Sequence, residues 1–258
     1  MNETLSVMER RRSTRAYSAE PVTQAERDAI LHAAFRAPTA GNMMLYSIIE
    51  VEDQALKEHL AETCDHQPFI AQAPYVLLFL ADYQRWFDYY TQSGVRERCQ
   101  ELGREYRTPA VSDMLLACCD ALVAAQNAVI AAEALGIGSC YIGDMLENYE
   151  VQREKFALPP YVLPITLLCF GRPVREHSTD SHTARFAPEF IAFKNRYHRL
   201  DAGEMERMFQ PLQQRSAPAG KYEFEAQNLG QHEYFRKFNA DFSVEMSRSV
   251  REMLKNWE

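Results

Sequence analysis

The stretch Tyr75-Val76-Leu77-Leu78-Phe79-Leu80-Ala81 carries no charged or strongly polar side chain. A strand with one covered face alternates apolar and polar side chains, so this run predicts a strand buried on both faces. Leu158–Gly171 ends in a second run of this kind, and Ser47–Val51 and Ser139–Ile142 are shorter candidates. We therefore expect one sheet with a hydrophobic core on each side.

Helical patterns separate the expected strands. Thr23-Gln-Ala-Glu26 has the spacing of a capping box, and Ser112 is the expected N-cap of a long helix. That helix is apolar almost all round, so we expect it to be the central core helix. This alternation predicts an α+β or α/β domain around one sheet. The expected helices span residues 3–10, 23–36, 53–63, 83–107, 112–135 and 151–157.

The character of the chain changes after Arg172-Pro173. Residues 1–173 hold all the expected strands, whereas residues 174–258 are polar and hold none, so we divide the chain into a core and a C-terminal extension. With no second core in the extension, its last helix should pack on the main domain or on a partner subunit. The apolar stripe of that helix comprises Phe242, Met246, Val250, Met253, Leu254 and Trp257.

Composition limits the classes of function. The 258 residues carry a net charge of -8, which argues against a general nucleic-acid binder. The first residues hold no apolar leader, and the apolar segment Met114–Leu135 is interrupted by polar residues, so we expect a cytoplasmic protein without a membrane span. The six cysteines form no C-x-x-C motif, and no histidine or cysteine spacing predicts a metal site.

Against this acidic background, Arg11-Arg12-Ser13-Thr14-Arg15 places three guanidinium groups and two hydroxyl groups in five residues. Arginine offers paired planar donors that suit a phosphate, and serine adds a short donor. The alternative is a solvated basic patch paired with nearby acids. The chain has only 10 glycines and no Gly-rich phosphate loop, so any phosphate should be held by side chains.

Four segments, in this order, resemble the motifs of the nitroreductase family of FMN enzymes. They are Arg11–Tyr17, Ala37–Asn42, Ala131–Gly143 and Leu167–Pro173. Gln67 and the long C-terminal extension are most similar to the branch of oxygen-insensitive NADPH nitroreductases and flavin reductase P. The resemblance implies an α+β nitroreductase-type fold, with a central, mainly antiparallel sheet flanked by helices and an extension that wraps a homodimer.

The resemblance also implies an activity: FMN-dependent reduction of nitroaromatics, quinones or free flavin by NADPH or NADH, in a two-electron ping-pong cycle. FMN would carry the hydride chemistry, so no catalytic side chain is expected. The sequence leaves NADPH or NADH open, as it does the physiological acceptor. Two alternatives also remain: a specialised reductase, for example a reductive dehalogenase, and a flavin-binding or sensing protein without turnover.

The resemblance assigns the first segment, Arg11–Tyr17, to the cofactor, and we call this segment the Arg-rich motif. Arg11 and Ser13 would hold the FMN phosphate, and Arg15 would reach the N1/O2 edge of the flavin ring. Arg12 belongs to the same motif but receives no specific contact. Arg185 would be a second phosphate ligand.

The other segments would line the ring. Thr39 and Asn42 would do so from the segment Ala37–Asn42, which we call the second loop. In this family such contacts commonly come from the other subunit. Gln67 would hydrogen-bond the pyrimidine edge. The backbone near N5 would come from Tyr141, Ile142 and Gly143.

The sequence departs from the family pattern at three places. Met43–Leu45 follow Asn42 where a glutamine is frequent, and Thr183 stands where the branch often has a lysine, which puts FMN affinity in question. Asp144 follows Gly143 at a position where small residues are common. Its carboxylate could alter the flavin potential or the acceptor choice, or it points to solvent.

Two further segments are candidates for substrate contacts. Residues 83–107 contain Trp86, Phe87, Tyr89 and Tyr90, which could stack on a planar acceptor or pack within a helical excursion. The second candidate is the pair Arg215 and Lys221, which could bind the 2′-phosphate of NADPH or lie in a solvated loop.

Overall fold

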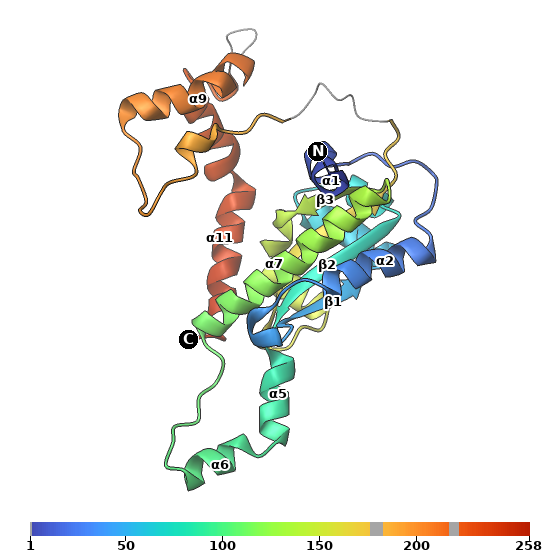
Figure 1. The fold of residues 1–258 in the computed structure, drawn as a ribbon, viewed down its shortest axis with the longest axis vertical. Helices are drawn as coiled ribbons and strands as arrows, with labels where there is room; N and C mark the ends of the chain where they lie inside the picture. The colour runs from blue at the N-terminus through green and yellow to red at the C-terminus, as the bar shows by residue number, and fades with distance from the viewer. Residues whose placement is uncertain (1, 176–182, 217–221) are drawn as a thin grey trace. The chain divides into compact units, whose positions relative to one another are not determined.

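A computed structural model describes residues 2–175, 183–216 and 222–258, and Figure 1 shows its ribbon. The chain divides into two compact units, Met1–Glu176 with Glu245–Glu258, and His177–Val244. The strands are β1 (Tyr46–Glu50), β2 (Tyr75–Asp82), β3 (Gly138–Ile142) and β4 (Val162–Gly171). The helices are α1 (Glu3–Arg10), α2 (Gln24–Phe35), α3 (Gln54–Thr63), α4 (Phe69–Gln72), α5 (Gln84–Gln92), α6 (Val95–Glu101), α7 (Val111–Ala134), α8 (Tyr149–Lys155), α9 (Ala202–Ser216), α10 (Leu229–Glu233) and α11 (Asp241–Leu254). Three short 3-10 helices are η1 (Ala40–Asn42), η2 (Gly143–Leu146) and η3 (Pro188–Phe190), and η4 (Tyr234–Phe238) is a π-helical turn.

The four strands form one antiparallel sheet in the order β1-β2-β4-β3. Every residue of β2 is buried, which confirms the prediction from the apolar run at 75–81. Tyr75 of β2 pairs with Phe170 of β4, and Cys140 of β3 pairs with Cys169 of β4. Because all neighbouring strands are antiparallel, the fold is α+β, and β3 is an edge strand open to further pairing.

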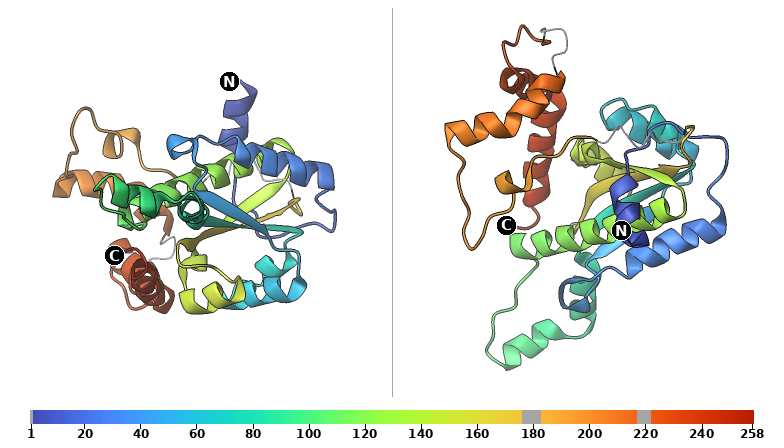
Figure 2. Two further views of the ribbon diagram at one scale, coloured as in Figure 1. Left: turned by 90° about the horizontal axis from the view of Figure 1, so that it is seen from below. Right: turned by 45° about the horizontal axis from the view of Figure 1, so that its top comes forward.

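Helices cover both faces of the sheet, as the left view of Figure 2 shows. On one face, α2 and α7 bury Ile30 and Ala128 against Leu77 of β2. On the other face, α3 and α4 bury Leu60 and Ile70. This arrangement confirms the expectation of two cores around one sheet.

The long helix α7 has two different faces. Its inner face carries alanines at helical spacing, including Ala121, Ala124 and Ala128, which are fully buried. The opposite face leaves large apolar side chains exposed: Leu115, Leu116, Leu122 and Val123. By length and composition alone α7 could cross a membrane, but core helices of water-soluble proteins pass the same test. The prediction of a core helix is therefore confirmed for the inner face of α7. Among the described residues, none buries the large apolar side chains of the opposite face.

The start of α7 corrects the sequence analysis. The helix begins at Val111, and the N–H of Ala110 donates to the Asp113 carboxylate at 2.9 Å. Arg107 also binds Asp113, and this ion pair holds the pKa of the carboxyl below its usual range. Ser112 is thus not the N-cap, because the acid one position later secures the first turn.

The end of α11 packs on the main domain. Trp257 is completely buried, with its ring 5.3 Å from that of Tyr161. The Tyr149 N–H donates to Ser249 at 3.1 Å, and the Asn148 N–H donates to Glu245 at 3.1 Å. Glu245–Glu258 thus contacts the main domain of its own chain, while packing of the extension on a partner subunit stays a prediction. The division of the chain at residue 173 stays a prediction.

The unit His177–Val244 is helical, and its described residues contain no strand. Helices α9 and α10 lie along a cavity of about 680 Å³. Met205 and Phe209 of α9 and Leu229 of α10 give this cavity an apolar lining.

Candidate functional site

The Arg-rich motif lies along the open edge of β3. Ser13 forms a parallel bridge with Ser139, and the Thr14 N–H donates to the Ser139 carbonyl at 2.9 Å. Further along, Tyr17 forms an antiparallel bridge with Pro173. The segment thereby satisfies backbone groups of an edge strand, and in return the sheet fixes the positions of its side chains.

Two glycines permit this close approach. A Cβ on Gly138 would lie 2.1 Å from Thr14 Oγ1, and a Cβ on Gly171 would lie 2.6 Å from Tyr17 Cδ1. Thr14 is 3% exposed, and the Tyr17 hydroxyl donates to the Thr14 carbonyl at 3.0 Å. Thr14 and Tyr17 therefore anchor the motif on the sheet.

Three of the predicted phosphate and ring ligands converge beside Cys140 of β3. Burial raises the pKa of the Cys140 thiol, while the Arg15 and Arg11 charges and hydrogen bonds with Ser13 and Arg15 lower it. Ser13 and Arg15 are exposed, and Arg11 is half-buried. Two cations and a hydroxyl therefore lie near Cys140, and such a group of donors suits an anion.

The end of β3 and Gly143, which follows it, join this group. Burial raises the pKa of Tyr141 to about 12 against the opposing charge of Arg11, so Arg11 lies near that ring. Tyr141 is 37% exposed, whereas the Ile142 side chain is 1% exposed and points into the core. At Gly143, a Cβ would meet no atom within 4 Å. Ile142 can therefore contribute only its backbone, and the surface at Gly143 is open.

Gln67 lies next to this segment. Its Nε2 donates to the Cys64 carbonyl at 2.8 Å and to the Asp144 carboxylate at 2.7 Å. Two residues further on, the ring of Phe69 lies 6.0 Å from the guanidinium carbon of Arg15. The structure thus brings the Arg-rich motif, the Gln67 loop and the segment after β3 together.

The structure does not support the expectation that Asp144 points to solvent. It is half-buried and accepts a hydrogen bond from Gln67, so its side chain does not simply point to solvent. Nearby, Glu147 is 5% exposed, and burial with the charges of Asp144, Asp65 and Glu245 raises its pKa to about 7. Glu147 could not be identified as a site residue from the sequence, because nothing in its spacing indicates burial.

The second loop is held by a buried acid. Asp120 of α7 accepts from the Ala40 N–H at 2.9 Å and from the Leu45 N–H at 3.1 Å. Thr39 Oγ1 accepts from the Met44 N–H at 3.2 Å, and Asn42 adopts a left-handed backbone with φ 56°. From the sequence, Asp120 was only an interruption of an apolar helix; an acid in the middle of such a helix was the available signal.

Thr39 and Asn42 are anchored away from the Arg-rich motif. The loop is tied to Asp120, whereas Arg10, at the end of α1, pairs with Glu133 near the other end of α7 at 3.7 Å. Asp120 and Glu133 are 13 positions apart, which corresponds to roughly 20 Å at the rise of an α-helix. Within one chain, the two motifs are therefore fixed at widely separated points of α7.

The remaining predicted residues are placed as follows. Arg12 is half-buried within the motif. Arg185 is exposed and belongs to the other compact unit, and among the described residues it donates to the Thr183 and Ala184 carbonyls. Arg215 lies in the last turn of α9, while Lys221 lies outside the described residues.

The aromatic segment mostly packs on the core. Trp86 Nε1 donates to the Met43 carbonyl at 2.7 Å, and the ring of Phe87 lies 5.1 Å from that of Tyr161. The ring of Tyr90 lies 5.8 Å from that of Trp86. Tyr89 is 60% exposed and is the member of the group that remains open to solvent.

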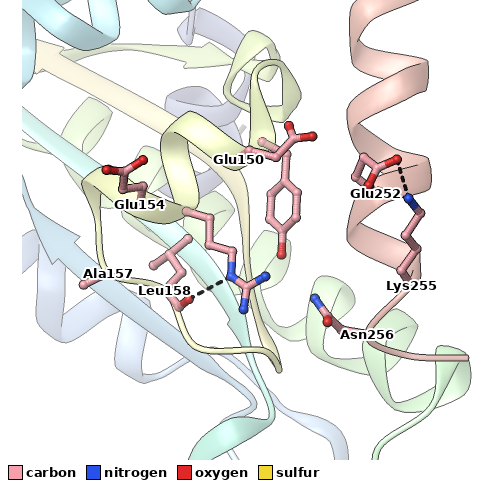
Figure 3. A pocket seen from close by; sticks show the side chains of 9 residues that line it. Glu150, Glu154, Ala157, Leu158, Glu252, Lys255 and Asn256 are labelled. Atoms are coloured by element: carbon pink, nitrogen blue, oxygen red, sulfur yellow. Dashed lines mark hydrogen bonds and ion pairs between the residues drawn. The ribbon is translucent and has the colours of Figure 1, made fainter.

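A pocket of about 460 Å³ between α8 and the C-terminal segment contains none of the predicted site residues (Figure 3). Lys255 in this pocket pairs with Glu252 at 2.7 Å. Arg153 donates to the Leu158 carbonyl at 3.3 Å. Because its lining carries charges of both signs, this pocket suits an anion less well than the site at β3.

Comparisons with known proteins agree with the geometry. The sequence profile described as "Nitroreductase family" matches residues 8–172. The oxygen-insensitive NADPH nitroreductase of Salmonella typhimurium is 32% identical over 201 residues, which cover 78% of this chain and 77% of that protein. An FMN reductase [NAD(P)H] of Bacillus subtilis is 35% identical over 173 residues, covering 67% of each.

Solved structures show the same fold. The hypothetical oxidoreductase YcnD from Bacillus subtilis superimposes with a TM-score of 0.77 at 28% identity, covering 100% of this chain and 98% of that one. The NADPH:FMN oxidoreductase from Vibrio harveyi, solved as a complex with NAD+, has a TM-score of 0.77 at 22% identity, covering 98% of both chains.

Proposed function

Since this chain belongs to the nitroreductase family, we propose that it is an FMN-dependent oxidoreductase that uses NADPH or NADH to reduce nitroaromatics, quinones or free flavin. The observation that carries the proposal is the pairing of the Arg-rich motif with β3. This pairing brings Arg11, Ser13 and Arg15 near Cys140 and Arg11 near Tyr141. The sensing alternative and the dehalogenase alternative gain no specific support from this geometry.

The residues at β3 fit FMN. Arg11 and Ser13 would bind the phosphate, because a guanidinium and a hydroxyl supply charge-assisted donors from a fixed backbone. Arg15 would lie at the N1/O2 edge and stabilise negative charge there. The open space over Gly143 leaves room for a flat ring along the backbone of Tyr141–Gly143.

Bound FMN supplies the two-electron hydride chemistry, and the protein supplies placement, electrostatics and an open ring face. This division of labour needs no nucleophile, and none is proposed. Arg185 is proposed as a second phosphate ligand. A cytoplasmic location is also part of the proposal.

We further propose that the protein is a homodimer that completes the site with the second loop of the partner. Within one chain, Thr39 and Asn42 are anchored roughly 20 Å along α7 from the anchor of α1. The exposed apolar face of α7, with Leu115 57% and Leu122 46% exposed, is the surface that a second copy would cover. The end of α11 no longer supports this argument, since Trp257 is buried within its own chain.

Flavin binding tests the cofactor assignment. The protein stripped of flavin is titrated with FMN, and quenching of flavin fluorescence gives the Kd. We expect Arg15→Ala to weaken binding about tenfold or more, because a hydrogen bond to a charged group contributes ~1.5–3 kcal/mol. Arg104→Ala, at an exposed arginine outside the site, should bind like the unchanged protein. Failure of the unchanged protein to bind FMN would overturn the proposed function.

Analytical ultracentrifugation tests the dimer. Leu122→Asp places a carboxylate in the exposed apolar face of α7, so we expect a shift to monomer together with weaker FMN binding. Ala55→Asp, the same kind of change at an exposed position of α3, is the matched control. An unchanged protein that sediments as a monomer while it binds FMN would contradict the dimer.

A further inference from the structure

Gln67 uses both hydrogens of its side-chain amide within the protein. Nε2 donates to the Cys64 carbonyl at 2.8 Å and to Asp144 Oδ2 at 2.7 Å. A primary amide has two N–H donors and one carbonyl acceptor. With both donors engaged, only Oε1 of Gln67 remains to meet a ligand.

The backbones of both partners are fixed. The Gln67 N–H donates to the Ala61 carbonyl at 2.8 Å, and the Gln67 carbonyl accepts from the Ile70 N–H at 3.1 Å. On the other side, the Asp144 carbonyl accepts from the Glu147 N–H at 3.0 Å within η2. The hydrogen bond between the two side chains therefore joins two rigid turns that lie 77 residues apart in the sequence.

Asp144 determines which end of the amide faces outward. Rotating the Gln67 amide by half a turn would place Oε1 against the Asp144 carboxylate and the Cys64 carbonyl, which are both acceptors. That arrangement would break two hydrogen bonds, one of them charge-assisted, and replace them with repulsion. A small residue at position 144 would remove the charged partner and leave the amide freer to rotate.

We propose that Asp144 is a positioning residue that holds Gln67 as a hydrogen-bond acceptor, so that the site selects the N3–H of the flavin pyrimidine edge. The inference rests on the proposed function, in which FMN binds with that edge toward Gln67. The pyrimidine edge presents the acceptors N1, O2 and O4, and its only N–H is at N3. Arg15 is a donor and Gln67 a fixed acceptor, so together they complement this pattern.

The test measures binding rather than turnover. FMN and 3-deaza-FMN, which has a CH2 group in place of N3–H, are titrated separately into flavin-free protein, and their Kd values are compared. We expect the unchanged protein to prefer FMN by about tenfold or more, because a site built around a hydrogen bond leaves its polar group unpaired with the analogue. Asp144→Ala should lower this preference to about threefold or less.

Asp144→Asn separates orientation from charge. The asparagine carbonyl can still accept from Gln67 Nε2, so this variant should keep the preference within about threefold of the unchanged protein. Circular dichroism checks that each variant is folded. An Asp144→Ala protein with the original preference, an Asp144→Asn protein that loses it equally, or an unchanged protein that binds both flavins equally would each overturn the inference. Absence of any FMN binding by the unchanged protein would instead overturn the proposed function.

Discussion

Gly138 provides a sharp test of how the Arg-rich motif is held. In Gly138→Ala, the new Cβ would lie 2.1 Å from Thr14 Oγ1 and 2.6 Å from Thr14 Cβ. Carbon atoms in favourable contact are separated by ~3.5–4.0 Å, so the segment at Thr14 must move by roughly 1 Å. Such overpacking costs about 1–3 kcal/mol of folding free energy.

The displacement should also weaken cofactor binding. Ser13 and Arg15 flank Thr14, and the hydrogen bond from the Thr14 N–H to Ser139, 2.9 Å long, sets their positions. Loss of one hydrogen bond to a charged group costs about 1.5–3 kcal/mol, which corresponds to a 10- to 100-fold increase in the FMN Kd.

The assay combines urea denaturation with FMN titration by fluorescence quenching. Gly203→Ala is the matched control, because its Cβ would have 3.5 Å to the nearest atom. Adding Thr14→Ala to Gly138→Ala removes Thr14 Oγ1 and should restore part of the affinity. A Gly138→Ala protein that binds FMN as tightly as the original would refute the argument that close packing on β3 positions the phosphate ligands.

Two further predictions concern stability. Burial and neighbouring acids raise the pKa of Glu147 from 4.5 to about 7, so the folded protein holds a proton that the unfolded chain has released. Folding stability should therefore fall as the pH rises through that window, and Glu147→Gln should flatten this dependence and stabilise the protein by about 1–3 kcal/mol above pH 7 in urea denaturation; an unchanged slope would contradict the effect. Trp257→Ala should cost about 3–5 kcal/mol in the same assay, because a fully buried side chain and its contact with Tyr161 are lost, and a cost below about 1 kcal/mol would count against docking of the C-terminus.

The sequence was informative where the physical signal is local. The all-apolar run at 75–81 predicted β2, and the spacing of Thr23 and Glu26 predicted a capping box, in which the Thr23 N–H donates to Glu26 at 2.9 Å. Each of these signals depends on residues within one element, so no tertiary context is needed to interpret it.

The remaining features depend on contacts between distant segments. Asp120 holds the second loop across 75 residues or more, and Asp144 meets Gln67 across 77 residues. Spacing along the chain carries no information about such pairs. The sequence also could not show that one face of α7 is left exposed, because a helix that is apolar all round is compatible with burial in its own core or in a partner.

Anaerobic reduction of the bound flavin tests the central claim most directly. The protein is purified, loaded with FMN, and mixed without oxygen with NADPH or NADH while the flavin absorbance near 450 nm is followed. We expect at least one nicotinamide to bleach the flavin, and a nitroaromatic, a quinone or free flavin to restore the absorbance. FMN that stays oxidised with both nicotinamides, in a folded protein that holds it, would contradict the assignment of this chain as an oxidoreductase.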